Sequence, residues 1–351
     1  MKEYDCDILV AGAGPAGSCA AREAALGGAK VLLLERKPVI GEPVRCAEFI
    51  PKQLLGELGC QKNFIVQPVN SMRTILPDGE VSEIRSPGCM IDRSRFDQEL
   101  AFGAEEAGAE TWLETRVHSF INNIVTVFKN NDPIAVRPKI IIGADGPRSR
   151  VGKWAGLCNK NLIPAVQATV SLKKTMDYTE VYFNRDFYGG YGWIFPKGNK
   201  ANIGIGMKPL SGYPGILENL HRFIREQKDA EKITGSPESY TAGWIPAELP
   251  EKAVYKNIML AGDAAGQTHP VTGAGVSQAV ISGRMAGRWA ARAVKENNLS
   301  LINGYDSEWQ DLFGESQKRA YERRVLMENN WNDLNNIIKK CWVAFREYYK
   351  A

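Results

Sequence analysis

Residues 5–37, DCDILVAGAGPAGSCAAREAALGGAKVLLLERK, constrain the fold more than any other part of the chain. A short apolar strand leads into Gly12-x-Gly14-x-x-Gly17, a helix with a face of small residues follows, and a second strand ends in Glu35. In such a unit Gly12 permits the tight turn, Gly14 lets a pyrophosphate approach the backbone, and Gly17 allows close helix–strand packing. The acid is placed to bind a ribose hydroxyl. The unit predicts a Rossmann-like dinucleotide-binding domain and leaves the choice between NAD and FAD open.

Two later stretches bear on that choice. In KIIIGADGPRSRVGKWAG, residues 139–156, a buried-looking strand ends before Asp145. In NIMLAGDAAGQTHPVTGAGVSQAV, another strand ends before Asp263, and a long helix begins after Gly275. An aspartate at the end of each strand can accept hydrogen bonds from hydroxyl groups. The glycine-bounded helix start presents free N–H groups to an oxygen or to an electron-poor ring.

Together the three stretches resemble the fingerprints of flavoproteins with the para-hydroxybenzoate hydroxylase fold. In that family the aspartate matched by Asp263 binds the ribityl chain, and the Asp-Gly pair serves FAD and the nicotinamide donor. The resemblance implies non-covalent FAD, with NADPH, NADH or a reduced ferredoxin as electron donor. It places at the cofactor Gly12, Gly14, Ala16, Gly17, Glu35, Arg36, Arg45, Cys46, Ala47, Arg93, Val117, Asp145, Gly146, Gly262, Asp263, Pro270, Gly273, Gly275 and Val276.

Two stretches between the fingerprints indicate a branch of this family. GEPVRCAEFIP occupies residues 41–51, and MIDRSRFDQELAFGAEEAGAE at residues 90–110 reads as a helix that Gly108 ends. Both resemble the geranylgeranyl reductase family, which shows Pro-Val-Arg-Cys and Ile-Asp-Arg-x-x-Phe-Asp and saturates prenyl double bonds. That family also carries Pro-x-x-Tyr-x-Trp-x-Phe-Pro, matched here by residues 188–196 with Tyr188 in place of the first proline. This replacement lies where the family forms the mouth of the substrate pocket, so it affects which substrate fits.

The stretch YGGYGWIFPKG, residues 188–198, combines aromatic rings with bare glycines. Because side chains alternate along a strand, Tyr191, Trp193 and Phe195 share one face, and the glycines leave the other face open to close approach. An apolar wall beside a flavin suits a hydrocarbon substrate, whereas the alternative is an aromatic core strand. The predicted substrate residues are Tyr188, Tyr191, Trp193, Phe195 and Pro196.

Reduction of an isolated alkene needs a proton donor as well as a hydride, because no carbonyl polarises the double bond. The candidate catalytic residues are Cys46, Tyr191 and Trp193. Cys46 also fits a small buried apolar residue, and Arg45 also fits a solvated charge. His269, before a proline, favours a structural role.

The predicted fold class is α/β (α+β), with a Rossmann-like FAD-binding domain, an antiparallel-sheet substrate domain and C-terminal helices. The FAD-binding domain takes residues 1–64, 87–158 and 253–300, and the substrate domain takes 65–86 and 159–252. Residues 301–351 form the helical C-terminal segment. We expect the apolar stripe of this segment to pack on the body of the protein rather than on a membrane surface. The stripe comprises Leu334, Ile337, Ile338, Cys341, Trp342, Phe345 and Tyr349.

Composition limits the location and the partners of the chain. The net charge of +4 is too small to indicate nucleic-acid binding, and no apolar run is long enough to span a membrane. The odd count of seven scattered cysteines, without the pattern of a secretion signal, favours reduced thiols, and the lack of any CxxC pair or Cys/His cluster favours no metal site. We expect a cytoplasmic protein that acts on an apolar prenyl substrate, with peripheral membrane contact and oligomeric state left open.

Two other functions use the same fold. Flavin-dependent halogenases place Trp-x-Trp-x-Ile-Pro where this chain has Tyr191-x-Trp193-x-Phe195-Pro196, which weakens a halogenase without excluding a flavin monooxygenase. A non-catalytic or quinone-linked electron-transfer flavoprotein is the third hypothesis, and the aromatic stretch speaks against it.

Overall fold

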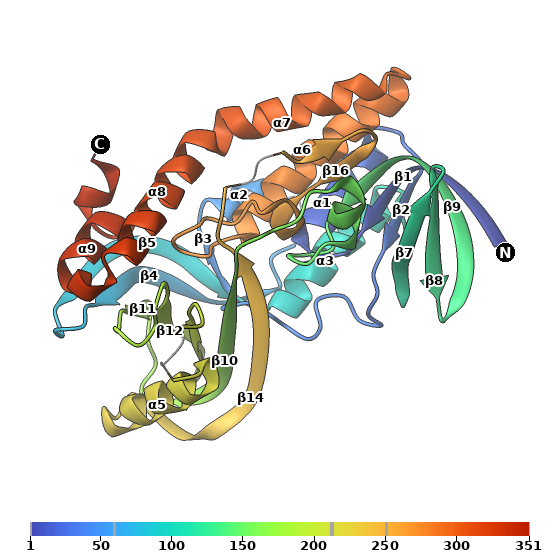
Figure 1. Ribbon diagram of the computed structural model, residues 1–351. Coiled ribbons are helices and arrows are strands. Elements are labelled where there is room, and N and C mark those ends of the chain that lie inside the picture. The colour runs from blue at the N-terminus through green and yellow to red at the C-terminus, as the bar shows by residue number, and fades with distance from the viewer. Residues whose placement is uncertain (1, 59–60, 211–213, 250–251, 351) are drawn as a thin grey trace.

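Two β-sheets, each of eight strands within the described residues, organise the chain in a computed structural model (Figure 1). The structure describes residues 2–58, 61–210, 214–249 and 252–350. The helices are α1 (Pro15–Leu26), α2 (Leu54–Glu57), α3 (Arg93–Glu106), α4 (Arg150–Ala155), α5 (Ile216–Asp229), α6 (Val276–Lys295), α7 (Gly304–Trp309), α8 (Glu315–Asn329) and α9 (Leu334–Cys341).

The first sheet is the predicted Rossmann-like sheet. Its path is β15-β16-β9-β1-β2-β6, in which β16, β9, β1, β2 and β6 are parallel, and β7 and β8 form a hairpin on β9. The strands are β1 (Lys2–Ala11), β2 (Val31–Leu34), β6 (Glu110–Trp112), β7 (Thr115–Ile121), β8 (Ile124–Lys129), β9 (Asp132–Gly143), β15 (Val254–Tyr255) and β16 (Ile258–Leu260).

Helices α1 and α6 cross at small residues beside this sheet. An added Cβ at Gly283 would lie 2.1 Å from the carbonyl oxygen of Ala16, and one at Gly287 would lie 2.2 Å from that of Ala20. A larger side chain at either glycine would force the two helices apart. The small face that the sequence gives to α1 therefore serves this close helix contact.

The second sheet has the order β14-β10-β13-β12-β11-β4-β5-β3. Its pairs are antiparallel as predicted, except that β11 and β4 are parallel. No hairpin joins these two strands, because the chain passes through the first sheet between them, so nothing forces them to be antiparallel. The strands are β3 (Phe49–Pro51), β4 (Ile65–Ile75), β5 (Val81–Ile91), β10 (Leu162–Leu172), β11 (Tyr178–Tyr182), β12 (Tyr191–Lys197), β13 (Lys200–Gly206) and β14 (Ile233–Pro246).

The second sheet is broader than the segments 65–86 and 159–252. It includes β3, and the boundary after residue 86 falls inside β5. The division into domains stays a prediction, because strand pairing alone does not define independently folding units.

The C-terminal helices extend from the first sheet to the second as one arm (Figure 1). Leu334, Ile337, Ile338, Cys341 and Trp342 are buried in a cluster with residues of the second sheet. The predicted stripe is thus a contact on the body of the protein. Its last member is wrong: Tyr349 is 59% exposed and the neighbouring Tyr348 is buried, because α9 ends at Cys341 and the helical period stops there. No helix among the described residues is long and apolar enough to cross a membrane.

Candidate active site

The carboxyl ends of β1, β9 and β16 meet at one edge of the first sheet. Gly143 of β9 pairs with Ala11 of β1 on one side and with Leu260 of β16 on the other. The three predicted cofactor motifs begin directly after these strand ends, so the fold brings them side by side. Open α/β sheets bind nucleotides at such an edge.

The glycine loop between β1 and α1 is crowded at its ends and open in its middle. Gly12 has a φ of +100°, and an added Cβ there would lie 2.4 Å from the carbonyl oxygen of Ala144. A Cβ at Gly17 would lie 1.8 Å from the carbonyl oxygen of Gly12. At Gly14 no atom of the described residues lies within 4 Å of an added Cβ, and no side chain among them caps the start of α1. This open space before free N–H groups fits a pyrophosphate.

Glu35 ties the glycine loop to the end of β2. Its carboxylate accepts the N–H of Ala13 at 3.0 Å and the N–H of Lys37 at 3.0 Å. A ribose hydroxyl bound by the remaining lone pairs would therefore lie over the same loop. That contact, predicted from the sequence, stays a prediction.

Asp263 offers an acceptor at the start of α6. Its Oδ1 accepts the Thr268 hydroxyl at 2.9 Å, and an added Cβ at Gly275 would lie 3.2 Å from the same oxygen. Its Oδ2 makes no hydrogen bond within the part of the chain that the structure describes. Burial raises the pKa of the carboxyl group. An acceptor without a partner next to an uncapped helix start fits a hydroxyl of the ribityl chain.

The carboxylate of Asp145 is hydrogen-bonded to groups of the protein itself. It accepts the N–H of Arg150 at 2.6 Å, the N–H of Val151 at 3.3 Å and the hydroxyl of Ser149. The carboxylate thus supports the start of α4, while Gly146, with a φ of +85°, turns the chain. The predicted role of Asp145 toward FAD and its donor remains a prediction.

Residues 269–275 meet the aromatic strand β12, and they are named the flavin loop here because the sequence predicts cofactor contacts at Pro270, Gly273 and Gly275. The hydroxyl of Tyr191 donates to the carbonyl oxygen of Thr272. An added Cβ at Gly273 would lie 3.4 Å from Ile245 and 4.0 Å from the Tyr191 hydroxyl. Burial raises the pKa of Tyr191, so its side chain is a neutral phenol at physiological pH. Predicted cofactor residues and predicted substrate residues converge at this contact.

Gln167 of β10 joins the other two catalytic candidates. The indole Nε1 of Trp193 donates to Gln167 Oε1 at 3.4 Å, and Gln167 Nε2 donates to the carbonyl oxygen of Cys46 at 2.8 Å. Trp193 is 7% exposed and its ring lies against Gly204. Sequence reasoning did not identify Gln167, since a single amide in a strand belongs to no motif.

The predicted substrate residues do not all lie on one face of β12. The ring of Phe195 lies 6.2 Å from that of Phe49, on the same side as Trp193. Pro196 faces the opposite side, because strand side chains alternate. Tyr188 lies on the turn before β12, and its ring centroid is 5.4 Å from that of Trp331. The predicted wall therefore consists of Tyr191, Trp193 and Phe195.

The glycine side of β12 is filled by the protein. An added Cβ at Gly192 would lie 3.1 Å from the rings of Phe187 and Phe223, and Phe223 belongs to α5. The close approach that the glycines permit is thus made by an internal helix. At Gly192 the rings of Phe187 and Phe223 thus occupy the space that a ligand on this side would need.

The predicted arginines have different surroundings. Arg93 binds both oxygens of Asp97 at 2.9 Å, so its guanidinium is held inside the protein beside Cys46. The side chains of Arg36 and Arg45 are exposed. Ala47 lies beside Asn202, and Val117 is buried on β7. The cofactor contacts predicted for these residues are untested.

Glu48, which the sequence did not single out, is a buried carboxylate behind the Cys46 segment. It is 3% exposed and contacts Lys197 Nζ at 2.9 Å, Asn202 Nδ2 at 2.8 Å and the N–H of Arg93 at 2.9 Å. Its own N–H donates to Cys46 Sγ at 3.2 Å, with a φ of +72°. Glu48 thereby fixes the cysteine segment to the second sheet and to α3.

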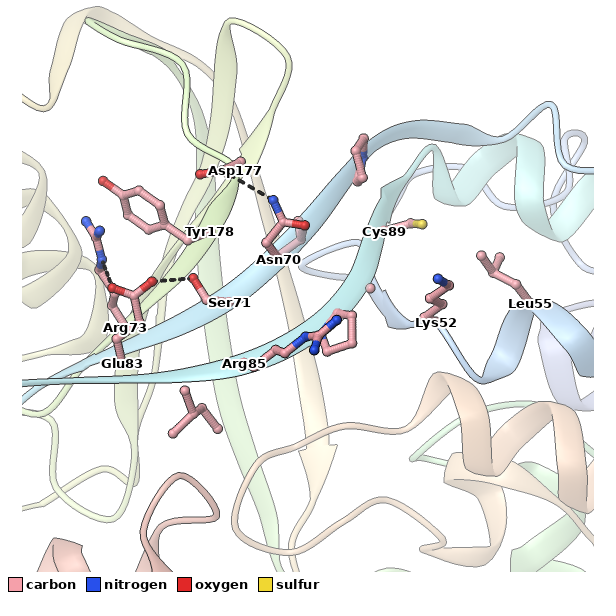
Figure 2. Close-up of a pocket in the computed structure, with 15 residues that line it drawn as sticks. Lys52, Leu55, Asn70, Ser71, Arg73, Glu83, Arg85, Cys89, Asp177 and Tyr178 are labelled. Carbon is pink, nitrogen blue, oxygen red and sulfur yellow. Dashed lines mark hydrogen bonds and ion pairs between the residues drawn. The ribbon is translucent and has the colours of Figure 1, made fainter.

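A groove of about 730 Å³ lies on another part of the second sheet, across β4 and β5 (Figure 2). Arg73 pairs with Glu83 at 2.9 Å, and Asn70 bonds to Asp177 at 2.9 Å along its wall. Along β5, Arg85 and its neighbours line the groove. None of the predicted site residues lies in it, so it is separate from the candidate active site.

The surroundings of His269 predict a pH-dependent stability. Its Nδ1 accepts the N–H of Thr272 at 3.2 Å, and its Nε2 lies 3.2 Å from the Tyr348 hydroxyl. Burial lowers its pKa to about 4, so the folded state binds this proton less readily than the unfolded state does. We expect the free energy of unfolding to fall by up to about 3 kcal/mol as the pH drops from about 6.5 to about 4.

Denaturant titrations across this pH range should compare the wild type with His269→Gln, which keeps an acceptor but no titrating ring. Only the wild type should lose stability through this ring, so the difference in unfolding free energy between the two proteins should change by up to about 3 kcal/mol between pH 7 and pH 4. Curves that stay parallel between pH 7 and pH 4 would show that His269 does not contribute to the pH dependence.

Comparison with known proteins supports the predicted fold and family. A family model described as the geranylgeranyl reductase catalytic domain matches residues 162–238, and an FAD binding domain model matches residues 5–179. A digeranylgeranylglycerophospholipid reductase of Methanosphaera stadtmanae is 36% identical over 323 residues, covering 85% of this chain and 81% of that protein.

Solved structures agree as well. A geranylgeranyl bacteriochlorophyll reductase-like protein from Thermoplasma acidophilum superimposes with a TM-score of 0.89 at 28% identity, over 98% of this chain and 93% of that one. A flavin-dependent brominase variant, at 17% identity and a TM-score of 0.77 over 98% of this chain and 97% of its own, shares the fold. The predicted fold class and the prediction of FAD are confirmed. The chain belongs to the geranylgeranyl reductase family of FAD-dependent oxidoreductases.

Proposed function

We propose that this chain reduces carbon–carbon double bonds in the geranylgeranyl chains of a glycerophospholipid. The observation that carries the proposal is the contact of the aromatic face of β12 with the flavin loop, through Tyr191 and Thr272. An apolar wall at that position suits a hydrocarbon chain, which offers no polar group for recognition. The substrate class follows the names of the relatives, and a lipid in a bilayer also favours peripheral membrane contact.

The roles of the side chains follow from their hydrogen bonds. When bound, FAD in its reduced form supplies a hydride to one alkene carbon, and the other carbon needs a proton. The Tyr191 hydroxyl is engaged by Thr272, so Tyr191 orients the wall and the flavin loop. Cys46 Sγ accepts an N–H from Glu48, which leaves the thiol proton free to be donated. We assign proton delivery to Cys46 and contact with the hydrocarbon chain to Trp193 and Phe195.

The test is anaerobic reduction of a digeranylgeranylglycerophospholipid by dithionite-reduced protein, followed by mass spectrometry. Each saturated double bond adds two hydrogen atoms. We expect Cys46→Ala to lower the rate on the order of 100-fold, while flavin reduction by dithionite is unchanged. The matched control is Cys158→Ala, because Cys158 is exposed and lies outside the site.

The competing monooxygenase function has a distinct outcome. With reduced protein, lipid and labelled dioxygen, a reductase yields peroxide and no oxygenated product. Incorporation of label into the lipid, or absence of any saturated lipid, would overturn the proposal. The electron donor we propose is NADPH, NADH or a reduced ferredoxin, and anaerobic bleaching of the flavin by each compound identifies it.

A further inference from the structure

The C-terminal segment is anchored at two points near the aromatic strand, one on the turn between β11 and β12 and one on β4 of the second sheet. The indole of Trp331 donates to the carbonyl oxygen of Arg185 at 2.8 Å, and the indole of Trp342 donates to the Thr74 hydroxyl at 3.0 Å. The ring of Trp342 also lies 5.1 Å from that of Tyr191. Figure 1 shows α8 and α9 lying at the end of this sheet. The segment therefore packs against Tyr191, on the aromatic side of the proposed substrate wall.

One side chain of α8 reaches both parts of the site at once. Arg324 is 3% exposed, and its Nη1 donates to the carbonyl oxygen of Pro270 at 2.9 Å. Its Nη2 donates to the carbonyl oxygen of Gly189 at 2.6 Å. Pro270 belongs to the flavin loop, and Gly189 lies two residues before the aromatic strand begins. The two carbonyl groups come from the two sides of the site, and one guanidinium group holds both.

The residues around Arg324 are consistent with a buried charge. Glu328, one helical turn further along, lies 2.8 Å from Nη2, and Lys208 pairs with Glu328 at 2.7 Å. Burial lowers the pKa of Arg324, and the carboxylate of Glu328 opposes that shift. A guanidinium has a rigid planar set of donors, whereas an ammonium is a point charge on a flexible stem. Lysine at this position would keep the charge without holding both carbonyl groups.

The flavin loop has a second support from the same segment. Tyr348 lies 3.2 Å from His269 Nε2, and His269 in turn binds Thr272, whose carbonyl oxygen accepts the Tyr191 hydroxyl. The loop is thus held between the aromatic strand on one side and the C-terminal segment on the other. Small displacements of the loop would change the distance between the cofactor and the substrate wall.

We propose that Arg324 is a positioning residue, which sets the spacing between the flavin loop and the aromatic strand and so aligns the alkene for hydride transfer. The proposal rests on the proposed function for the nature of the substrate. The spacing itself does not depend on the substrate, since both bonds of Arg324 are internal to the protein. Reaction rates respond steeply to such alignment, because a displacement of about 1 Å can cost on the order of 100-fold.

The experiment compares Arg324→Lys and Arg324→Met with Lys318→Met, a control at an exposed position of the same helix. Each protein is measured for FAD affinity, the visible circular dichroism of bound flavin, the melting temperature of the apoprotein, kcat and KM. For both Arg324 variants we expect an altered flavin spectrum, a kcat lowered on the order of 100-fold, and an FAD affinity and a KM within about threefold of wild type. Relative to Arg324→Met, Arg324→Lys should restore more of the wild-type melting temperature than of the wild-type kcat.

The outcomes separate the two proposals. If the wild type saturates no prenyl lipid, the proposed function fails, and the flavin spectrum still decides the role of Arg324. Variants with lowered melting temperature but wild-type flavin spectra would overturn the positioning role. A kcat that is restored in Arg324→Lys to the same extent as the melting temperature would also overturn the positioning role.

Discussion

Replacing Gly14 by valine is expected to lower the affinity for FAD about 100-fold, equivalent to about 3 kcal/mol, while the apoprotein keeps its fold. An added Cβ at this position meets nothing within 4 Å in the part of the chain that the structure describes, and Gly14 has a φ of −76°, which every residue type adopts. The protein therefore tolerates the new side chain, whereas a pyrophosphate approaching the start of α1 does not. Titration of apoprotein with FAD and a melting curve of the apoprotein measure the two effects.

The matched control is Gly215→Val at the start of α5. Among the described residues nothing lies within 4 Å of an added Cβ there, and Gly215 has a φ of −65°, but it lies outside the predicted cofactor site. We expect Gly215→Val to bind FAD as the wild type does. Equal FAD affinity in both variants would show that the pyrophosphate does not lie over Gly14.

Replacing Trp193 by alanine is expected to lower both stability and substrate affinity. The side chain is 7% exposed and its ring lies against Gly204, so truncation should cost about 3–5 kcal/mol of unfolding free energy. If the exposed edge of this wall binds the hydrocarbon chain, KM should also rise about tenfold or more, because a large apolar contact with the ligand is lost. Denaturant titration and steady-state kinetics on one preparation measure both.

Trp309→Ala separates the two effects. Trp309 is 2% exposed and belongs to the core of the first sheet, where its ring stacks on Phe313 at 4.3 Å. It should lose a similar amount of stability without a change in KM. A KM that is unchanged in Trp193→Ala as well would make the aromatic strand a core element only.

Local sequence was sufficient for the elements whose signals lie close together in the chain. The glycine loop and its strands are specified within residues 5–37. The atoms that leave no room for a side chain at Gly12 and Gly17 belong to the same unit or to the end of the adjacent strand. Alternation along β12 likewise predicted that Tyr191 and Trp193 share a face. The parallel pairing of β11 with β4 was not predictable in this way, because it depends on the path of the chain between them.

The sequence by itself determined the cofactor class, the family and the aromatic strand, because glycine patterns and strand alternation are short-range properties of the backbone. Only the tertiary structure decided which side chains complete the site. Tyr191 and Thr272 are 81 residues apart, and Arg324 and Gly189 are 135 apart. A buried arginine on a helix or a glutamine on a strand gives no local signal of its partner. Such contacts form only when the packing of both sheets and the C-terminal helices brings unsatisfied carbonyl groups within reach of these side chains. They are then required, because a buried polar group must find a hydrogen-bond partner.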